Sequence, residues 1–142
     1  MQTPTAESSS PTPFEVLVVD DNIDAAETLA LLLQCEGYNV TMAHDGASAL
    51  KQASEVPPDL VLLDIGLPGI DGFEVARRLR QQGLSKTTLV ALTGYGGAAD
   101  VQQALEAGFD HHVLKPVPLE RLSELIGQVR AGGRIRASLN SR

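Results

Sequence analysis

The polar residues that could do chemistry in this sequence directly follow short apolar runs. Asp20 and Asp21 follow 16-VLVV-19, Asp64 follows 60-LVLL-63, Thr93 follows 88-TLVAL-92, and Lys115 follows 112-HVL-114. Neighbouring carboxylates such as Asp20 and Asp21 repel each other, and the repulsion grows when they are partly removed from water. A positive group is therefore expected beside them.

Three carboxylates, a hydroxyl and an ammonium in one place would suit phosphoryl chemistry. Carboxylates bind Mg²⁺, which takes a few oxygen ligands and keeps several waters. A carboxylate can also act as a nucleophile and form an acyl phosphate. Phosphoryl transfer mainly requires positioning and neutralisation of charge, which Lys115 and Thr93 could supply. Taken singly, however, each residue could be an ordinary helix cap, turn residue or solvated side chain.

Strand-like and helix-like segments alternate after Phe14. The expected strands are 16–19, 38–43, 60–63, 88–92 and 112–114. The expected helices are a segment that starts at Asp24-x-x-Glu27 and stops at Gly37, then 46–54, 72–82, 97–107 and a last one with apolar residues from Leu119 to Val129. Strands that are almost continuously apolar are typical of a parallel sheet covered by helices on both faces. The pattern predicts an α/β domain in which the polar residues meet at the carboxyl edge of the sheet.

Composition limits the possible classes of protein. The chain has 142 residues, 43% of them hydrophobic, and a formal net charge of −7, which favours one domain and argues against binding to nucleic acid. It has no apolar run of about 18 residues, and its N-terminus lacks the basic and apolar regions of a signal peptide, so we expect no membrane insertion and a cytoplasmic location. The Pro-, Ser- and Thr-rich segment 1–13 predicts a disordered tail or linker, followed by a domain over 14–130 and a flexible tail over 131–142. Cys35 is expected to be a small buried hydrophobe.

Four stretches together resemble the receiver domain of two-component response regulators. They are 19-VDDN-22, 62-LLDIGLPGIDG-72, 91-ALTGYG-96 and 114-LKP-116, and their order and spacing fit the family. The resemblance covers about Glu15 to Arg130. It implies a doubly wound, flavodoxin-like (βα)5 sandwich with a five-stranded parallel sheet in the order 2-1-3-4-5.

The resemblance also implies a role for each acidic residue. Asp64 would accept the phosphoryl group. Asp20, Asp21 and Asp64 would bind Mg²⁺, together with the backbone carbonyl of Gly66, which lies two residues beyond the acceptor.

Further positions match residues that act in switching. Thr93 would be the switch hydroxyl, Lys115 the lysine that contacts the phosphoryl group, and Lys115-Pro116 a cis peptide bond. Three residues before the lysine, where the family usually has Tyr or Phe, this sequence has His112. We expect a weaker or differently routed switch with His112 partly exposed, and an ordinary surface histidine is the alternative. His44 and His111 are expected to be surface residues without a phosphate or metal role.

A receiver domain would be a signalling phosphoacceptor that catalyses only its own phosphotransfer and dephosphorylation. Its partners would be a histidine kinase or histidine phosphotransfer protein, and a protein target on the face of the fourth helix, fifth strand and fifth helix. A stand-alone regulator is expected, with a receiver from a hybrid histidine kinase as the alternative.

A small Mg²⁺-dependent phosphatase of the haloacid-dehalogenase kind is a less favoured alternative. It would need a second Asp two residues after the nucleophile, but Asn22 holds that position after Asp20 and Gly66 holds it after Asp64. A degenerate receiver would lack one of the acids, the Thr or the Lys, and none is missing.

Overall fold

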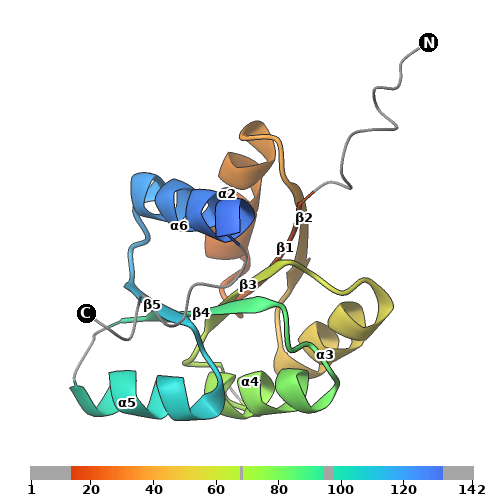
Figure 1. The fold of residues 1–142 in the computed structure, drawn as a ribbon, viewed down its shortest axis with the longest axis vertical. Helices are drawn as coiled ribbons and strands as arrows, with labels where there is room; N and C mark the ends of the chain where they lie inside the picture. Colours follow the sequence, from red (N-terminus) through yellow and green to blue (C-terminus); the bar gives the residue numbers. More distant parts are fainter. Residues whose placement is uncertain (1–13, 68, 95–97, 133–142) are drawn as a thin grey trace.

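The computed structural model describes residues 14–67, 69–94 and 98–132, and within them five parallel strands form a sheet in the order β2-β1-β3-β4-β5 (Figure 1). The strands are β1 (Glu15–Val19), β2 (Asn39–Ala43), β3 (Leu60–Asp64), β4 (Thr88–Thr93) and β5 (His111–Leu114). The helices are α2 (Ile23–Cys35), α3 (Gly46–Glu55), α4 (Gly72–Gln81), α5 (Ala98–Ala107) and α6 (Leu119–Gly132). The predicted fold class and strand order are confirmed.

The predicted tails over 1–13 and 131–142 lie outside the described residues, apart from residues 131 and 132, which are the last two residues of α6. In the part of the chain that is described, no helix is long and apolar enough to cross a membrane.

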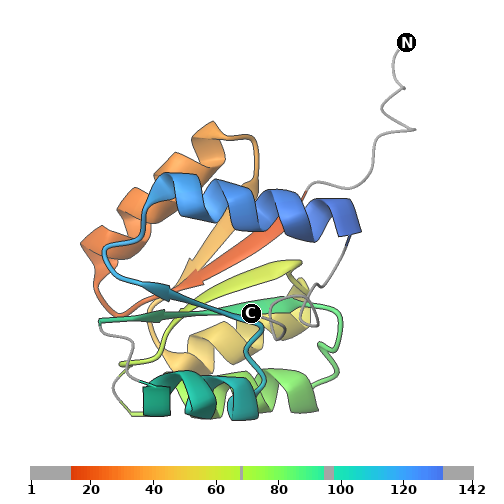
Figure 2. The same ribbon diagram turned by 60° about the vertical axis from the view of Figure 1, so that its left-hand side comes forward.

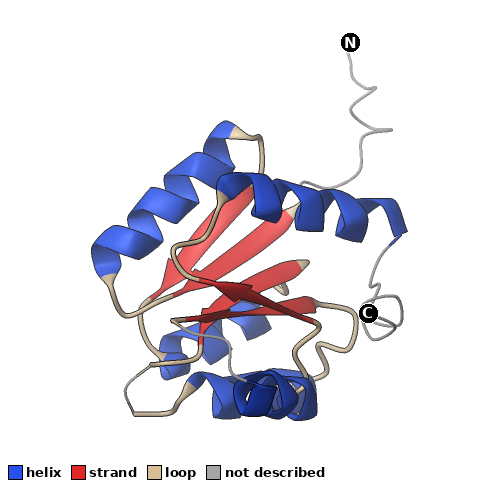
Figure 3. Ribbon diagram, turned by 90° about the vertical axis from the view of Figure 1, so that its left-hand side faces the viewer, coloured by secondary structure: helices blue, strands red, loops and turns tan. Residues whose placement is uncertain are grey.

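Helices cover both faces of the sheet. Helices α2 and α6 lie on one face, and α3, α4 and α5 lie on the other (Figures 2 and 3). Successive side chains of a strand point to opposite faces, so Val16 and Val18 pack with the first pair of helices while Leu17 and Val19 pack with the second group. Every residue of β3 is buried. The central strands are continuously apolar because neither face meets water.

The strand register sets the carboxyl ends level with one another. Val19 at the end of β1 pairs with Leu63 of β3, so the next residues, Asp20 and Asp64, are neighbours across the two strands. Asp64 in turn pairs with Leu92, the penultimate residue of β4. Residues far apart in the sequence therefore meet at one edge.

Helix α2 begins earlier than predicted. Its N-cap is Asn22, whose side-chain oxygen accepts a hydrogen bond of 3.0 Å from the Ala25 N–H. Asp24, which the sequence suggested as the start signal, lies in the first turn. A carboxylate there still favours the helix, because it faces the positive end of the helix dipole. The predicted stop at Gly37 is confirmed, since Gly37 follows the helix with a φ of +99°.

The prediction for Cys35 is wrong. Cys35 is the last residue of α2 and is exposed. The helix buries Ala26, Ala30 and Leu33, and Cys35 falls outside that stripe.

A buried ion pair lies at the end of the sheet where β4 and β5 begin. Arg80 of α4 contacts Asp110 at 2.9 Å, and the Asp110 side chain is fully buried. The same guanidinium donates hydrogen bonds to three backbone carbonyls, those of Leu84, Thr87 and Gly108. Asp110 also accepts from the Leu89 N–H at 3.0 Å. Such pairs are tolerated in an interior because the hydrogen bonds satisfy both charges.

His111 is buried, which contradicts the expected surface position. It opens β5, pairs with Val90 of β4 and has 3% of its surface exposed. Alternation along β5 places it on the same face as Val113, which packs with α6. Neither ring nitrogen has a hydrogen-bond partner among the described residues. Burial lowers the pKa of His111, the nearby Asp110 charge opposes this change, and Arg121 of α6 reinforces it.

We predict that this histidine makes the protein less stable in acid. The pKa of His111 is lower in the folded chain than the ordinary histidine value of about 6.5, so below that pH the unfolded chain binds more protons than the folded chain. The free energy of unfolding therefore falls as the pH is lowered, by at most about 1.4 kcal/mol per pH unit. Urea unfolding of wild type and His111→Leu at several pH values between 5 and 8 measures the effect. The difference between the two proteins should change as pH falls below about 6.5. A difference that is constant with pH would contradict the assignment.

Candidate functional site

Three carboxylates meet at the carboxyl edge of the sheet. Asp20 and Asp21 follow β1, Asp64 ends β3, and one carboxylate oxygen from each lies within 4.8 Å of the others. Asp20 and Asp64 are buried, whereas Asp21 is exposed. The acidic cluster predicted from the strand ends is therefore present.

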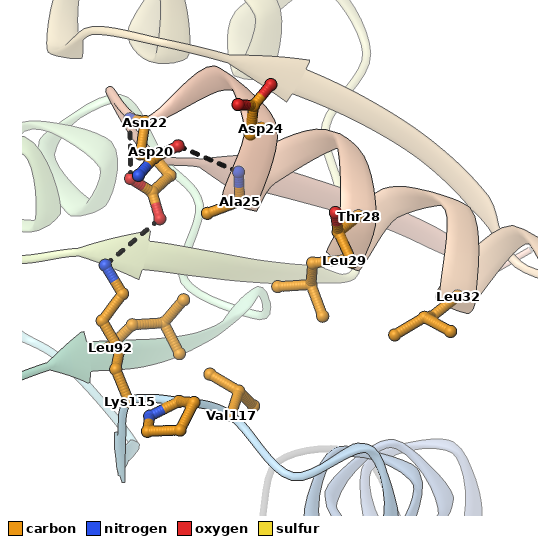
Figure 4. Close-up of a pocket in the computed structure, with 11 residues that line it drawn as sticks. Asp20, Asn22, Asp24, Ala25, Thr28, Leu29, Leu32, Leu92, Lys115 and Val117 are labelled. Carbon is orange, nitrogen blue, oxygen red and sulfur yellow. Dashed lines mark hydrogen bonds and ion pairs between the residues drawn. The ribbon is translucent and has the colours of Figure 1, made fainter.

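The Lys115 ammonium joins the two buried carboxylates. Its Nζ lies 3.2 Å from Asp20 Oδ2 and 3.2 Å from Asp64 Oδ2, and Figure 4 shows the contact with Asp20. The peptide bond between Lys115 and Pro116 is cis, as the resemblance implied. One ammonium thus offsets part of the repulsion among the three acids.

Burial and neighbouring charges change the pKa values of Asp20 and Lys115. Burial raises the pKa of Asp20, while a backbone hydrogen bond from Asn22 and the charge of Lys115 oppose the rise. Burial alone would lower the pKa of Lys115, but hydrogen bonds and charge interactions with Asp64 and Asp20 outweigh it and raise the pKa. Lys115 therefore stays charged between the acids.

Backbone N–H groups orient both buried carboxylates. Asn22 N donates to Asp20 Oδ1 at 2.9 Å, and Gly66 N donates to Asp64 Oδ1 at 2.8 Å. Each carboxylate thus uses one oxygen for the backbone and the other for Lys115. The loop after Asp64 folds back tightly, since a Cβ on Gly72 would lie 2.8 Å from the Asp64 carbonyl oxygen. Only glycine fits there without a shift of the chain.

Two further predicted residues lie on β4 and β5. Thr93 is buried at the end of β4, one position beyond the residue that pairs with Asp64, and its carbonyl accepts the Lys115 N–H at 2.8 Å. His112 is half-buried and pairs with Ala91. Its Nε2 is buried and has no hydrogen-bond partner among the described residues. The switching roles of both residues stay predictions.

His44 is not the plain surface residue that we expected. It follows β2, is half-buried, and its Nδ1 lies 3.0 Å from the backbone oxygen of Asp20. The sequence gives a weak signal for this contact, because the end of β2 must lie beside the end of β1 once the two strands are neighbours.

A groove of about 470 Å³ opens beside Asp20 and Lys115, between α2 and the connection from β5 to α6 (Figure 4). Leu29 and Leu32 of α2 line one wall, and Val117 lines the other. The groove therefore joins an apolar surface to the charged cluster.

The residues present fit a hard divalent cation. The side-chain atoms of the acidic cluster that could bind a metal are all carboxylate oxygens, which Mg²⁺ prefers as ligands. Asp21 is exposed, so the cluster is open to solvent. Bound there, the cation would offset the negative charge that Lys115 leaves uncompensated.

The chain belongs to the response regulator receiver domain family, whose model matches residues 16–127. A receiver domain is a signalling phosphoacceptor of two-component signal transduction, and membership implies a histidine kinase as partner. The cluster of Asp20, Asp21 and Asp64 is the acidic pocket of this domain, of the type that receivers use for Mg²⁺.

Relatives and solved structures agree with this family. The chain is 41% identical over 116 residues to the DNA-binding response regulator MtrA of Mycobacterium leprae, covering 82% of this chain and 49% of the relative. It is 36% identical over 129 residues to the transcriptional regulatory protein TrcR of Mycobacterium tuberculosis, covering 91% and 49%. The chain thus spans about half the length of these relatives.

Two solved structures share the fold. The chemotaxis protein CheY4 of Vibrio cholerae superimposes with a TM-score of 0.80 at 29% identity, covering 83% of this chain and 99% of that one. A putative response regulator from Chloroflexus aurantiacus gives a TM-score of 0.78 at 33% identity, covering 84% and 99%.

We predict that Mg²⁺ stabilises the protein through Asp21. At ten times its dissociation constant, bound Mg²⁺ should add about 1.4 kcal/mol to the free energy of unfolding. Asp21→Ala should weaken binding roughly tenfold, since a charged ligand is lost, yet should slightly stabilise the metal-free protein by removing repulsion. Melting curves with and without Mg²⁺ measure both effects. Asp24→Ala, an exposed acid outside the cluster, is the control and should respond to Mg²⁺ like wild type.

Proposed function

We propose that this protein receives a phosphoryl group on Asp64 from a phosphohistidine of a histidine kinase or histidine phosphotransfer protein. The observation that carries the proposal is the Lys115 ammonium, which lies 3.2 Å from carboxylate oxygens of both Asp20 and Asp64. A cation in contact with the acceptor can neutralise an incoming phosphoryl group. Mg²⁺, held by Asp20, Asp21, Asp64 and the Gly66 carbonyl, would supply further charge neutralisation.

The transfer is a substitution at phosphorus. A carboxylate oxygen of Asp64 forms the new O–P bond, the N–P bond of the donor breaks, and the electron pair of that bond returns to the imidazole. The backbone N–H of Gly66 holds the other carboxylate oxygen at 2.8 Å and so orients the nucleophile. Lys115 then moves its hydrogen bond from the carboxylate to the phosphoryl oxygens.

The phosphodonor is proposed to dock in the groove beside Asp20. Lys115, which contacts the acceptor, lines the groove together with the apolar residues Leu29, Leu32 and Val117. A helix with an apolar face and a phosphohistidine would fit both the charged and the apolar part. Leu32 on the α2 side of the groove has 40% of its surface exposed, which a docked partner could cover.

We propose that the downstream target protein binds the face formed by α5, β5 and α6. Thr93 would turn its hydroxyl toward the phosphoryl group, and the space it leaves would change the packing near His112. An imidazole with a buried nitrogen that lacks a partner costs more to bury fully than a phenyl ring does. We therefore propose that His112 contacts the target and that the switch is weaker than in family members with Tyr or Phe.

Two architectures fit this function. We propose a stand-alone regulator, and the alternative is a receiver within a larger protein. The relatives named above are about twice as long as their matched region, and MtrA is named a DNA-binding response regulator, which favours a transcriptional regulator over a hybrid histidine kinase as the larger protein. An immunoblot of source cells distinguishes these cases, because a band at the size of this 142-residue chain supports the stand-alone form.

Incubation with acetyl phosphate and Mg²⁺ tests the acceptor. Intact mass spectrometry should show one added phosphoryl group on wild type and none on Asp64→Asn, because an amide is not a nucleophile for this reaction. Asp71→Asn is the matched control, since Asp71 is an exposed acid that caps α4 and Asn caps a helix equally well. An added phosphoryl group on Asp64→Asn would show that another residue is the acceptor.

Adjacent leucines on α2 test the docking groove. Leu32 lines the groove, whereas Leu31, with 60% of its surface exposed, does not. Leu32→Gln should slow transfer from a phosphorylated histidine phosphotransfer protein roughly tenfold, the size expected when an apolar contact at an interface is lost. Transfer from acetyl phosphate should stay unchanged, because that donor is too small to use the groove. Equal rates for Leu31→Gln and Leu32→Gln with the protein donor would refute docking there.

A further inference from the structure

We propose that His44 is a positioning residue for the acidic pocket, because its Nδ1–H holds the Asp20 carbonyl and thereby fixes the peptide group that leads to Asp21. The proposal rests on the proposed function, since its consequence is tighter binding of Mg²⁺. It gives a role to a side chain outside the acidic cluster itself.

The His44 side chain continues the hydrogen-bond ladder between β1 and β2. The Asp20 N–H donates to the Ala43 carbonyl at 3.1 Å, one step beyond the pair formed by Val19 and Ala43. The next acceptor in this direction is the Asp20 carbonyl, and it lies 3.0 Å from His44 Nδ1. A carbonyl oxygen can only accept, so Nδ1 must carry the proton.

This bond controls Asp21 through the peptide plane. The carbonyl of Asp20 and the N–H of Asp21 belong to one planar group, so a donor on the oxygen sets the direction in which the chain enters Asp21. The Asp20 carboxylate is held separately by Asn22 and Lys115. The Asp21 carboxylate is exposed, so its place in the cluster depends on the backbone that carries it.

The bond is not needed to start the neighbouring helix. Asp45, the next residue, caps α3 with its own carboxylate, which accepts the Ser48 N–H at 2.7 Å. Loss of the His44 ring should therefore affect the acidic pocket, while loss of the Asp45 carboxylate should affect α3. The two adjacent side chains give a matched pair of variants.

The test compares His44→Ala, His44→Asn and Asp45→Ala by Mg²⁺ titration, followed by the backbone amide signals. His44→Ala should bind Mg²⁺ about three- to tenfold more weakly, as expected for one lost hydrogen bond, and the Asp21 amide signal should shift before any metal is added. His44→Asn should recover binding, because the Asn amide nitrogen is separated from the Cα by the same bonds as Nδ1. Asp45→Ala should lower the melting temperature and leave Mg²⁺ affinity unchanged.

Ring ¹⁵N spectra of wild type at pH 8 add a readout that needs no variant. They should show His44 as the Nδ1–H tautomer, and an Nε2–H tautomer would overturn the proposal. The proposal would also be overturned if wild type bound Mg²⁺ and His44→Ala bound it equally tightly. The same holds if His44→Asn failed to recover the Mg²⁺ affinity of wild type. If wild type itself gave no Mg²⁺ response, the metal site of the proposed function would fall, and the role of His44 with it.

Discussion

Repulsion among three carboxylates is the constraint on which the functional end of this fold depends. Parallel strands bring Asp20, Asp21 and Asp64 within 4.8 Å of one another, and the single ammonium of Lys115 touches two of them. Charges of one sign held this close favour any arrangement that lets them separate. Three features oppose this separation: the Lys115 ammonium, the backbone N–H groups that hold the two buried carboxylates, and the rigid strands beneath the pocket.

Rigidity comes from the central strands. Strands β1 and β3 lie in the middle of the sheet and are covered on both faces, so they cannot shift by one residue without exposing apolar side chains. The acidic residues sit directly at the ends of these strands rather than on long loops. The free energy gained by burying the core thus also stabilises a cluster that would otherwise move apart.

The sheet and the acidic cluster were predictable, because continuous apolar runs identify the strands and parallel strands end at the same edge. Contacts made by single side chains were harder to predict. Whether His111 faces α6 depends on which of the adjacent apolar residues Val113 and Leu114 points to the core, because alternate residues share a face. The N-cap at Asn22 competed with an equally suitable Asp24, and Cys35 lies just outside the buried stripe of α2. The bond from His44 to Asp20 joins two strand ends, and sequence spacing carries no measure of that distance.

The ion pair between Arg80 and Asp110 lies at the end of the sheet away from the acidic pocket. One guanidinium binds the carbonyls of the segment from α4 to β4 and of the turn before β5, while Asp110 also holds the start of β4. Neither segment can open alone without leaving a buried charge or carbonyl unsatisfied. The amides around Leu84, Thr87 and Gly108 should thus exchange with solvent deuterium as one cooperative unit. The ion pair therefore fixes the starts of β4 and β5 to each other, at the end of the sheet opposite to the acidic pocket.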